Sequence, residues 1–440
     1  MTENTPIDYN TVKTVLKREP HDFGNASIRD IVKIVSELEE ATGEKFIRME
    51  MGVPGLEVPS IAIEAEIKAL KSGKASKYAV LDGLPELKKE ISRFVKLFLD
   101  LDVSPQSCVP TVGSMQASMA VFMVANRSDY DREGTLFIDP GFPVQKLQLK
   151  VLGQDFRTFD VYNYRGKKLR EKLESYLKTG KVSSILYSNP NNPSWINFTD
   201  YELQTIAELA DKYDVIVIED LAYFGMDFRK DYSEPGKAPF QPTIGKYTDN
   251  YVLLISSSKA FSYAGQRIGS MVISDSLFKR KYSDLKRYFT SDEFGYCLIY
   301  NALYSLSAGV PHSPQYGLKA LLEAVNNGEY KFRDDVMEYA KRAKVMKKLF
   351  FENGFDLVYD NDDGEPLADG FYFTISYPGM QGGELLENLL YYGISAIALQ
   401  TTGSERTEGL RACVSQTSAE QLKDLEKRLK QFHKDFPVKG

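Results

Sequence analysis

Residues 256–269 read SSSKAFSYAGQRIG, and they follow the apolar run Tyr251–Ile255, YVLLI. This run predicts a buried strand. Lys259 stands just beyond its end, where a buried ammonium ion is costly unless it has a partner or a task. The preceding serines and Arg267 could together bind an anionic group. Lysine, hydroxyls, glycine and arginine in this order indicate a site for an aldehyde cofactor that is held covalently and carries a phosphate.

The composition of the whole chain excludes several classes of protein. At 440 residues, 43% hydrophobic and 26% charged, the chain is long enough for two domains with sizeable cores. Its net charge of −6 and its lack of a long basic run argue against nucleic-acid binding. The polar start, MTENTPIDYN, lacks the apolar core of a signal peptide, and no run approaches the roughly 20 apolar residues of a membrane span.

The three cysteines are far apart in the sequence, at Cys108, Cys297 and Cys413. Their number and spacing match neither a disulfide framework nor a metal site. Reduced thiols are therefore expected, together with a cytoplasmic location and no bound metal.

Strand and helix patterns alternate through the middle of the chain. Apolar runs at 134–140, 182–188 and 215–218 predict strands, and 200–213 has helical periodicity. This order predicts parallel βαβ units, with functional residues at the carboxyl ends of the strands. The last hundred residues instead mix a long helix (330–353), two strands (371–375 and 410–414) and a final helix that a Ser418–Gln421 capping box begins.

The lysine segment resembles the cofactor site of the class I and II aminotransferases, which are fold type I enzymes that use pyridoxal phosphate. The resemblance runs from about residue 50 to 415 and includes the turn Pro110–Ala117 and the loop Asn189–Ser194. It implies an α/β fold: a large domain with a mostly parallel seven-stranded sheet flanked by helices, and a smaller α+β domain. The implied divisions are an N-terminal segment that packs with the small domain (1–55), a large cofactor-binding domain (56–325) and the small domain (326–440).

The resemblance assigns the cofactor's attachment and its phosphate. It implies that Lys259 forms the Schiff base and moves protons during catalysis. The implied phosphate ligands come from the lysine segment, from the glycine turn and, in a homodimer with shared active sites, from the neighbouring subunit: Arg267, Ser256, Ser258, Ser114, Met115 and Tyr78. Judged alone, a glycine before a helix is common, and the tyrosine motif also fits a simple turn.

Four further residues correspond to those that hold the cofactor ring. By resemblance, Asp220 faces the pyridine nitrogen, Tyr223 and Asn192 bond the phenolic oxygen, and Phe142 stacks on the ring. An anionic carboxylate at Asp220 would keep the nitrogen protonated, so that the ring withdraws electrons from the reacting carbon. Without the resemblance, Asp220 would also fit a helix N-cap and Phe142 a core residue.

The substrate contacts implied are Arg411, Asn192 and Gly52. Arg411 matches the arginine for the α-carboxylate, and its planar fork suits that group. Gly52 matches the segment that covers the bound substrate. Two residues have no assigned role. Trp195 stands where the family usually has glycine, and it either alters the shape of the loop or forms part of the pocket wall. His312 lies either near the substrate or on the surface.

The resemblance implies an aminotransferase that moves an amino group from an L-amino acid to a 2-oxo acid by a ping-pong mechanism. The same motifs fit a C–S β-lyase on this fold. A ligand-sensing regulator of this fold would carry a helix-turn-helix segment, for which the roughly 45 N-terminal residues are too short and too acidic. By resemblance, members specific for dicarboxylates use a second arginine for the distal carboxylate. Residues 304–312, the corresponding region, contain no arginine, which weakens the case for a dicarboxylate substrate.

Overall fold

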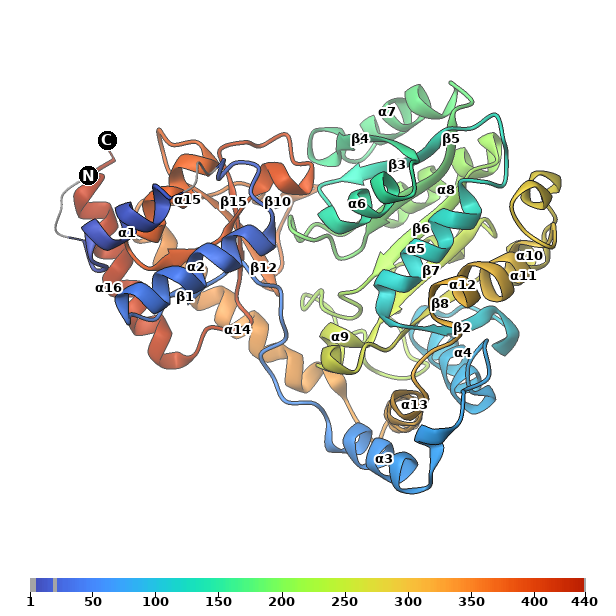
Figure 1. Ribbon diagram of the computed structural model, residues 1–440. Coiled ribbons are helices and arrows are strands. Elements are labelled where there is room, and N and C mark those ends of the chain that lie inside the picture. Colours follow the sequence, from blue (N-terminus) through green and yellow to red (C-terminus); the bar gives the residue numbers. More distant parts are fainter. Residues whose placement is uncertain (1–4, 19–21, 439–440) are drawn as a thin grey trace.

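The computed structural model describes residues 5–18 and 22–438. Residues 1–4, 19–21 and 439–440, which belong to the predicted N-terminal segment and small domain, lie outside the described residues. The chain forms two lobes, a large one built on a seven-stranded sheet and a smaller one built on a four-stranded sheet (Figure 1). The predicted α/β fold class is confirmed.

The large sheet has the strand order β2-β8-β7-β6-β5-β3-β4. β8 pairs antiparallel with both β2 and β7, and all other neighbours are parallel. Its strands are β2 (Cys108–Thr111), β3 (Gly134–Asp139), β4 (Asp155–Asp160), β5 (Val182–Ser188), β6 (Ile216–Leu221), β7 (Tyr251–Ser256) and β8 (Gly269–Ile273). The carboxyl ends of β5, β6 and β7 therefore meet at one edge, as the βαβ pattern predicts.

Helices cover both faces of this sheet because its strands are apolar on both sides. Leu253 and Ile255 of β7 pack in one core, whereas Val252 and Leu254 pack in the other. The first face is covered by α4 (Pro85–Leu99), α7 (Lys168–Leu177), α8 (Asp200–Tyr213) and α13 (His312–Asn326). The second face is covered mainly by α5 (Gly113–Ala125), α6 (Pro143–Val151), α11 (Phe294–Tyr296) and the helical segment Cys297–Leu303.

The smaller lobe has its own apolar core around the sheet β14-β15-β12-β9. Its strands are β9 (Asp356–Leu357), β12 (Tyr372–Ser376), β14 (Ile397–Ala398) and β15 (Leu410–Cys413). The helices that contribute buried residues to it are α1 (Tyr9–Leu16), α2 (Ile28–Thr42), α14 (Phe332–Phe351), α15 (Gly382–Leu390) and α16 (Ala419–Asp435). The Ser418–Gln421 capping box at the start of α16 is confirmed.

The two cores meet within α14, because Phe332 packs in the large-lobe core and Val336 in the small-lobe core. We propose that the lobes are domains divided near residues 55 and 325. None of the helices within residues 5–18 and 22–438 combines the length and the apolar character needed to cross a bilayer.

A strap at residues 49–55 links the lobes across the edge where the large sheet ends. It follows β1 (Ile47–Arg48), which pairs with β13 (Ile394–Ser395), and leads to α3 (Ser60–Lys71). The Met49 carbonyl accepts a 3.0 Å bond from the Cys413 amide, and the Pro54 carbonyl accepts 2.8 Å from Gln416 Nε2. These bonds fix the strap to the small lobe.

Candidate active site

A cavity of about 250 Å³ lies between the carboxyl ends of β5, β6 and β7 and the strand β15 of the small lobe. The strap covers part of it, and Gly52, Val53 and Pro54 line it. Every site residue predicted from the sequence except Tyr78 lines this cavity: Gly52, Ser114, Met115, Phe142, Asn192, Asp220, Tyr223, Ser256, Ser258, Lys259, Arg267 and Arg411.

Lys259 lies in α9 (Ser257–Ala260), directly after β7. Its ammonium nitrogen donates a hydrogen bond to the Gly52 carbonyl of the strap. Loss of hydration, together with the positive charges of Arg411 and Arg267, lowers the pKa of Lys259 to about 8. A substantial fraction of this amine is therefore neutral near pH 8, and the neutral form is the nucleophile for an aldehyde.

One end of the cavity is arranged to hold an anion. α5 begins at Gly113, whose backbone has φ +65°, and a Cβ there would lie 2.7 Å from Arg267 Nη2. Glycine thus lets the guanidinium approach the start of the helix, where free amides point outward. Ser256 and Ser258 lie on the same side, and the Ser258 amide donates 3.1 Å to Ser256 Oγ. A guanidinium, hydroxyls and helix amides form a suitable set for a phosphate.

Asp220 lies near the end of β6 and is 5% exposed. Its carboxylate accepts 2.8 Å from Gln145 Nε2 and 3.1 Å from the Ala222 amide. Burial raises the pKa of Asp220 to about 6, against the effect of these bonds. A cationic partner in the cavity would therefore stabilise the charged form of Asp220, which burial disfavours. Gln145 has no signal in the sequence, because it is one polar residue of an amphipathic helix.

Two polar atoms at the cavity are buried and have no hydrogen-bond partner among the described residues. They are Asn192 Oδ1, on the loop after β5, and Arg411 Nε, on β15. Arg411 is 1% exposed, and its Nη2 donates to the Glu50 carbonyl. Since buried polar groups are nearly always paired, both atoms indicate that the cavity is built for a polar ligand.

Tyr372 is a cavity residue that the sequence analysis missed. It lies on β12, and its hydroxyl accepts 2.8 Å from the hydroxyl of Tyr223. Its ring centroid is 4.7 Å from the guanidinium carbon of Arg411. Only the alternation of the strand 371–375 could have indicated which of its side chains face the cavity. Ser188 and Ile28 also line the cavity without having been predicted.

Trp195 lies behind the cavity wall. Its indole is 1% exposed and packs edge-on against Tyr223 and Tyr372, with ring centroids at 5.4 and 6.2 Å. Its backbone has φ +62°, a region that favours glycine. The loop thus keeps a glycine-like backbone while the indole supports the wall from behind.

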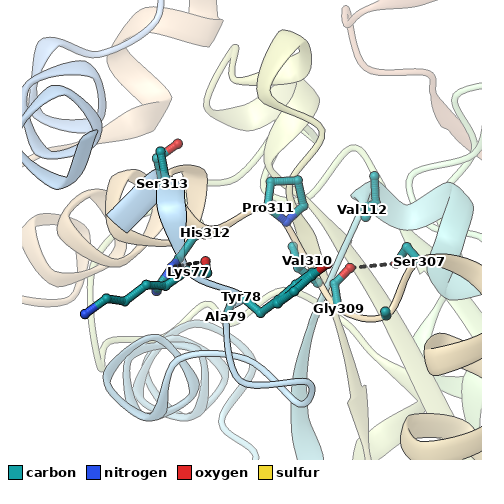
Figure 2. A pocket seen from close by; sticks show the side chains of 12 residues that line it. Lys77, Tyr78, Ala79, Val112, Ser307, Gly309, Val310, Pro311, His312 and Ser313 are labelled. Atoms are coloured by element: carbon teal, nitrogen blue, oxygen red, sulfur yellow. Dashed lines mark hydrogen bonds between the residues drawn. The ribbon is translucent and has the colours of Figure 1, made fainter. Parts of the chain in front are cut away.

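Tyr78 and His312 lie together in a separate pocket, with Gly309 and Val310 (Figure 2). Tyr78 is 95% exposed and is not among the described residues that line the Lys259 cavity. His312 Nδ1 lies 3.1 Å from the Lys74 carbonyl and 3.2 Å from the Lys77 carbonyl. His312 therefore belongs to the Tyr78 pocket and does not line the cavity.

Known proteins resemble this chain over most of its length. A family model described as aminotransferase class I and II matches residues 44–429. The Bacillus subtilis protein YugH, an aminotransferase by name, is 26% identical over 396 residues, which are 89% of this chain and 92% of that protein. A Methanocaldococcus jannaschii relative named for aspartate aminotransferase activity is 27% identical over 237 residues, so the match spans 53% of this chain and 58% of that relative.

The fold has solved counterparts. The alanine aminotransferase of Pyrococcus furiosus superposes with a TM-score of 0.74 at 21% identity, covering 93% of this chain and 97% of that one. This likeness supports a common fold.

Proposed function

Because the chain belongs to the class I and II aminotransferase family, we propose that it transfers an amino group from an L-amino acid to a 2-oxo acid with pyridoxal phosphate as cofactor. The observation that carries the proposal is the convergence on one cavity of a lysine, a buried carboxylate, a phosphate-type cradle and a buried arginine. The reaction would run as two half-reactions in a ping-pong sequence. A cytoplasmic location accords with this chemistry.

The residues of the cavity fit this cofactor. The cradle of Arg267, Ser256 and the start of α5 suits a phosphate, and the Lys259 amine suits an aldehyde. Asp220 suits a protonated ring nitrogen, because a nearby cation would offset the cost of its burial. The unpaired Asn192 Oδ1 and Arg411 Nε leave hydrogen-bonding capacity for the remaining ligand groups.

When bound, pyridoxal phosphate supplies an aldehyde for amines and a ring that accepts electrons from the substrate's α-carbon. We propose that Lys259 Nζ holds the cofactor covalently until the substrate's amino group displaces it. The freed amine would then move the proton from the substrate's α-carbon to C4′, the former aldehyde carbon of the cofactor, which lies two atoms further along. Its pKa of about 8 suits both steps at neutral pH.

The other residues bind and orient. We propose that Arg411, whose guanidinium is buried against Tyr372, binds the substrate's α-carboxylate. We propose likewise that Phe142 stacks on the ring face and that Tyr223 and Asn192 bond the phenolic oxygen; all three residues line the cavity. The strap with Gly52 covers the cavity and keeps water from the reacting atoms.

We propose further that the active enzyme is a homodimer. Tyr78 is 95% exposed and lines a surface pocket with Ser307 and Gly309, and other apolar side chains of the same two segments are at least 38% exposed: Val80, Tyr300, Tyr304 and Leu306. An aromatic side chain so exposed is suited to contact a second copy, where it would reach the phosphate of the partner's cofactor.

The test is a panel of L-amino acids against 2-oxoglutarate and pyruvate, with both the amino and the oxo products measured. We expect the amino and oxo products in equal amounts. When the acceptor is omitted, we expect no product beyond a single turnover of each site. Pyruvate and ammonia from cystathionine without any acceptor would contradict the proposal and support the β-lyase instead.

A further inference from the structure

Trp195 is held in a strained backbone position. Its φ of +62° suits glycine, and bulky side chains rarely occur there. The indole also needs Gly370 beneath it, because a Cβ at that position would lie 2.0 Å from Trp195 Cε2. Strain at a buried position persists only where the surrounding structure enforces it, and such positions cluster at functional sites.

The indole touches the two tyrosines whose hydroxyl groups meet at the cavity. Tyr223 and Tyr372 stand edge-on to Trp195 and to each other, with their own ring centroids 5.5 Å apart. Gly52 lets the Tyr372 hydroxyl reach this place, since a Cβ there would lie 1.9 Å from Oη. The positions of both hydroxyls are therefore determined by packing on several sides.

The hydroxyl groups of Tyr223 and Tyr372 can form hydrogen bonds in two arrangements. Each phenol has one proton to donate, and its oxygen can accept. In the structure Tyr223 donates to Tyr372 at 2.8 Å. If Tyr223 instead donates to an acceptor in the cavity, its oxygen becomes free to accept, and the Tyr372 hydroxyl can rotate to donate to it. Burial raises the pKa of Tyr223, and that of Tyr372 to about 12, so both protons are present at neutral pH.

We propose that Tyr372 is a positioning residue: it donates a hydrogen bond to Tyr223 and thereby strengthens the hydrogen bond from Tyr223 to the cofactor's phenolic oxygen. Trp195 packs against both tyrosines and fixes their positions relative to each other. A chain of hydrogen bonds polarises its members, so a donor onto Tyr223 makes Tyr223 a better donor in turn. This inference rests on the proposed function, because it assumes that pyridoxal phosphate occupies the cavity.

The experiment compares the wild type with Tyr372→Phe, Tyr223→Phe and the double variant. Trp195 is the chain's only tryptophan and contacts the cavity wall, so its fluorescence reports pyridoxal phosphate binding. The second readout is the pH midpoint at which the visible absorbance of the bound cofactor changes. Tyr392→Phe is the matched control, because it removes a hydroxyl bonded to Asp435 in the small-lobe core and away from the cavity lining.

We expect Tyr372→Phe to weaken cofactor binding about three- to tenfold and to raise the midpoint, since a weaker donor stabilises the phenolate less. The double variant should match Tyr223→Phe within about twofold, because Tyr372 acts through Tyr223. Wild-type values for Tyr372→Phe, or effects that multiply in the double variant, would overturn the inference. Absence of cofactor binding by the wild type would overturn the proposed function instead.

Trp195→Gly tests whether the indole fixes the positions of Tyr223 and Tyr372. Glycine suits the local backbone, so the loop conformation should persist while the tyrosines lose the indole. We expect a midpoint shift in the same direction as that of Tyr372→Phe, measured by absorbance. A folded Trp195→Gly protein with a wild-type midpoint would refute the role of the indole, and the Tyr372→Phe result stands independently of how this variant folds.

Discussion

Replacing Asp220 with asparagine is expected to stabilise the protein without cofactor while removing the function of the site. Asp220 is only 5% exposed, and burial raises its pKa to about 6 from the ordinary 3.8. The folded state therefore binds a proton more tightly than the unfolded state. Such a carboxyl costs the folded state about 3 kcal/mol at pH 7. Asparagine carries no charge, so it avoids this cost.

The pH dependence gives the sign of the effect. Because the folded pKa is the higher one, the cost is complete above pH 6 and disappears below pH 3.8, where both states are protonated. At pH 5 about half of the cost remains. Asparagine can keep the bond from the Ala222 amide, and the Gln145 amide can turn to accept from the new side chain. The gain should therefore approach the full value at pH 7.5.

The assay is urea unfolding of the cofactor-free proteins at pH 7.5 and pH 5, with equal slopes required for the comparison. Saturating pyridoxal phosphate should stabilise the wild type more than the variant, and turnover of the variant should fall at least about 100-fold. Glu219→Gln is the control, since Glu219 is an adjacent buried carboxyl outside the cavity lining and its loss should leave cofactor affinity within about twofold. If Asp220→Asn is less stable than the wild type at pH 7.5, burial of the Asp220 charge does not cost the folded state free energy as expected.

Three further predictions concern other parts of the site. Covalent capture of pyridoxal phosphate should accelerate as pH rises through about 8, because the Lys259 amine is neutral above its pKa. The rate of capture is measured from absorbance time courses at several pH values, and a pH midpoint of this rate near 10.5 would contradict the lowered pKa. Arg411→Lys should raise KM for the amino donor about 10- to 100-fold with cofactor affinity unchanged, and a KM within about twofold of wild type would exclude Arg411 as the carboxylate ligand. Tyr78→Ala should leave the unfolding free energy of the single subunit within about 0.5 kcal/mol, because Tyr78 is 95% exposed there, but weaken cofactor binding in the dimer; unchanged binding by equilibrium dialysis would argue against a shared site.

The sequence predicts best those features that lie close together along the chain. Lys259 follows an apolar run and precedes Arg267, so one segment indicates both the burial of the amine and a site for an anionic group. Asp220 could be placed because parallel strands end at one edge of a sheet. The apolar run 215–218 leads into Glu219 and Asp220, and β6 ends one residue later, at Leu221.

The features that escaped prediction depend on contacts between distant segments. Tyr372 reaches Tyr223 across 149 positions of sequence, and Gln145 reaches Asp220 across 75. Neither belongs to a local motif, so only the folded arrangement brings them together. Trp195 could be recognised as a departure from glycine, but its place behind the two tyrosines depends on Gly370 leaving room for the indole.

The proposed chemistry depends most directly on Lys259 as the residue that holds the cofactor. The purified protein, saturated with pyridoxal phosphate, is reduced with borohydride and digested, and the peptides are weighed by mass spectrometry. We expect one modified peptide, which contains Lys259, and no modification or turnover in Lys259→Ala. A modification on another lysine, or an unmodified and active protein, would contradict it.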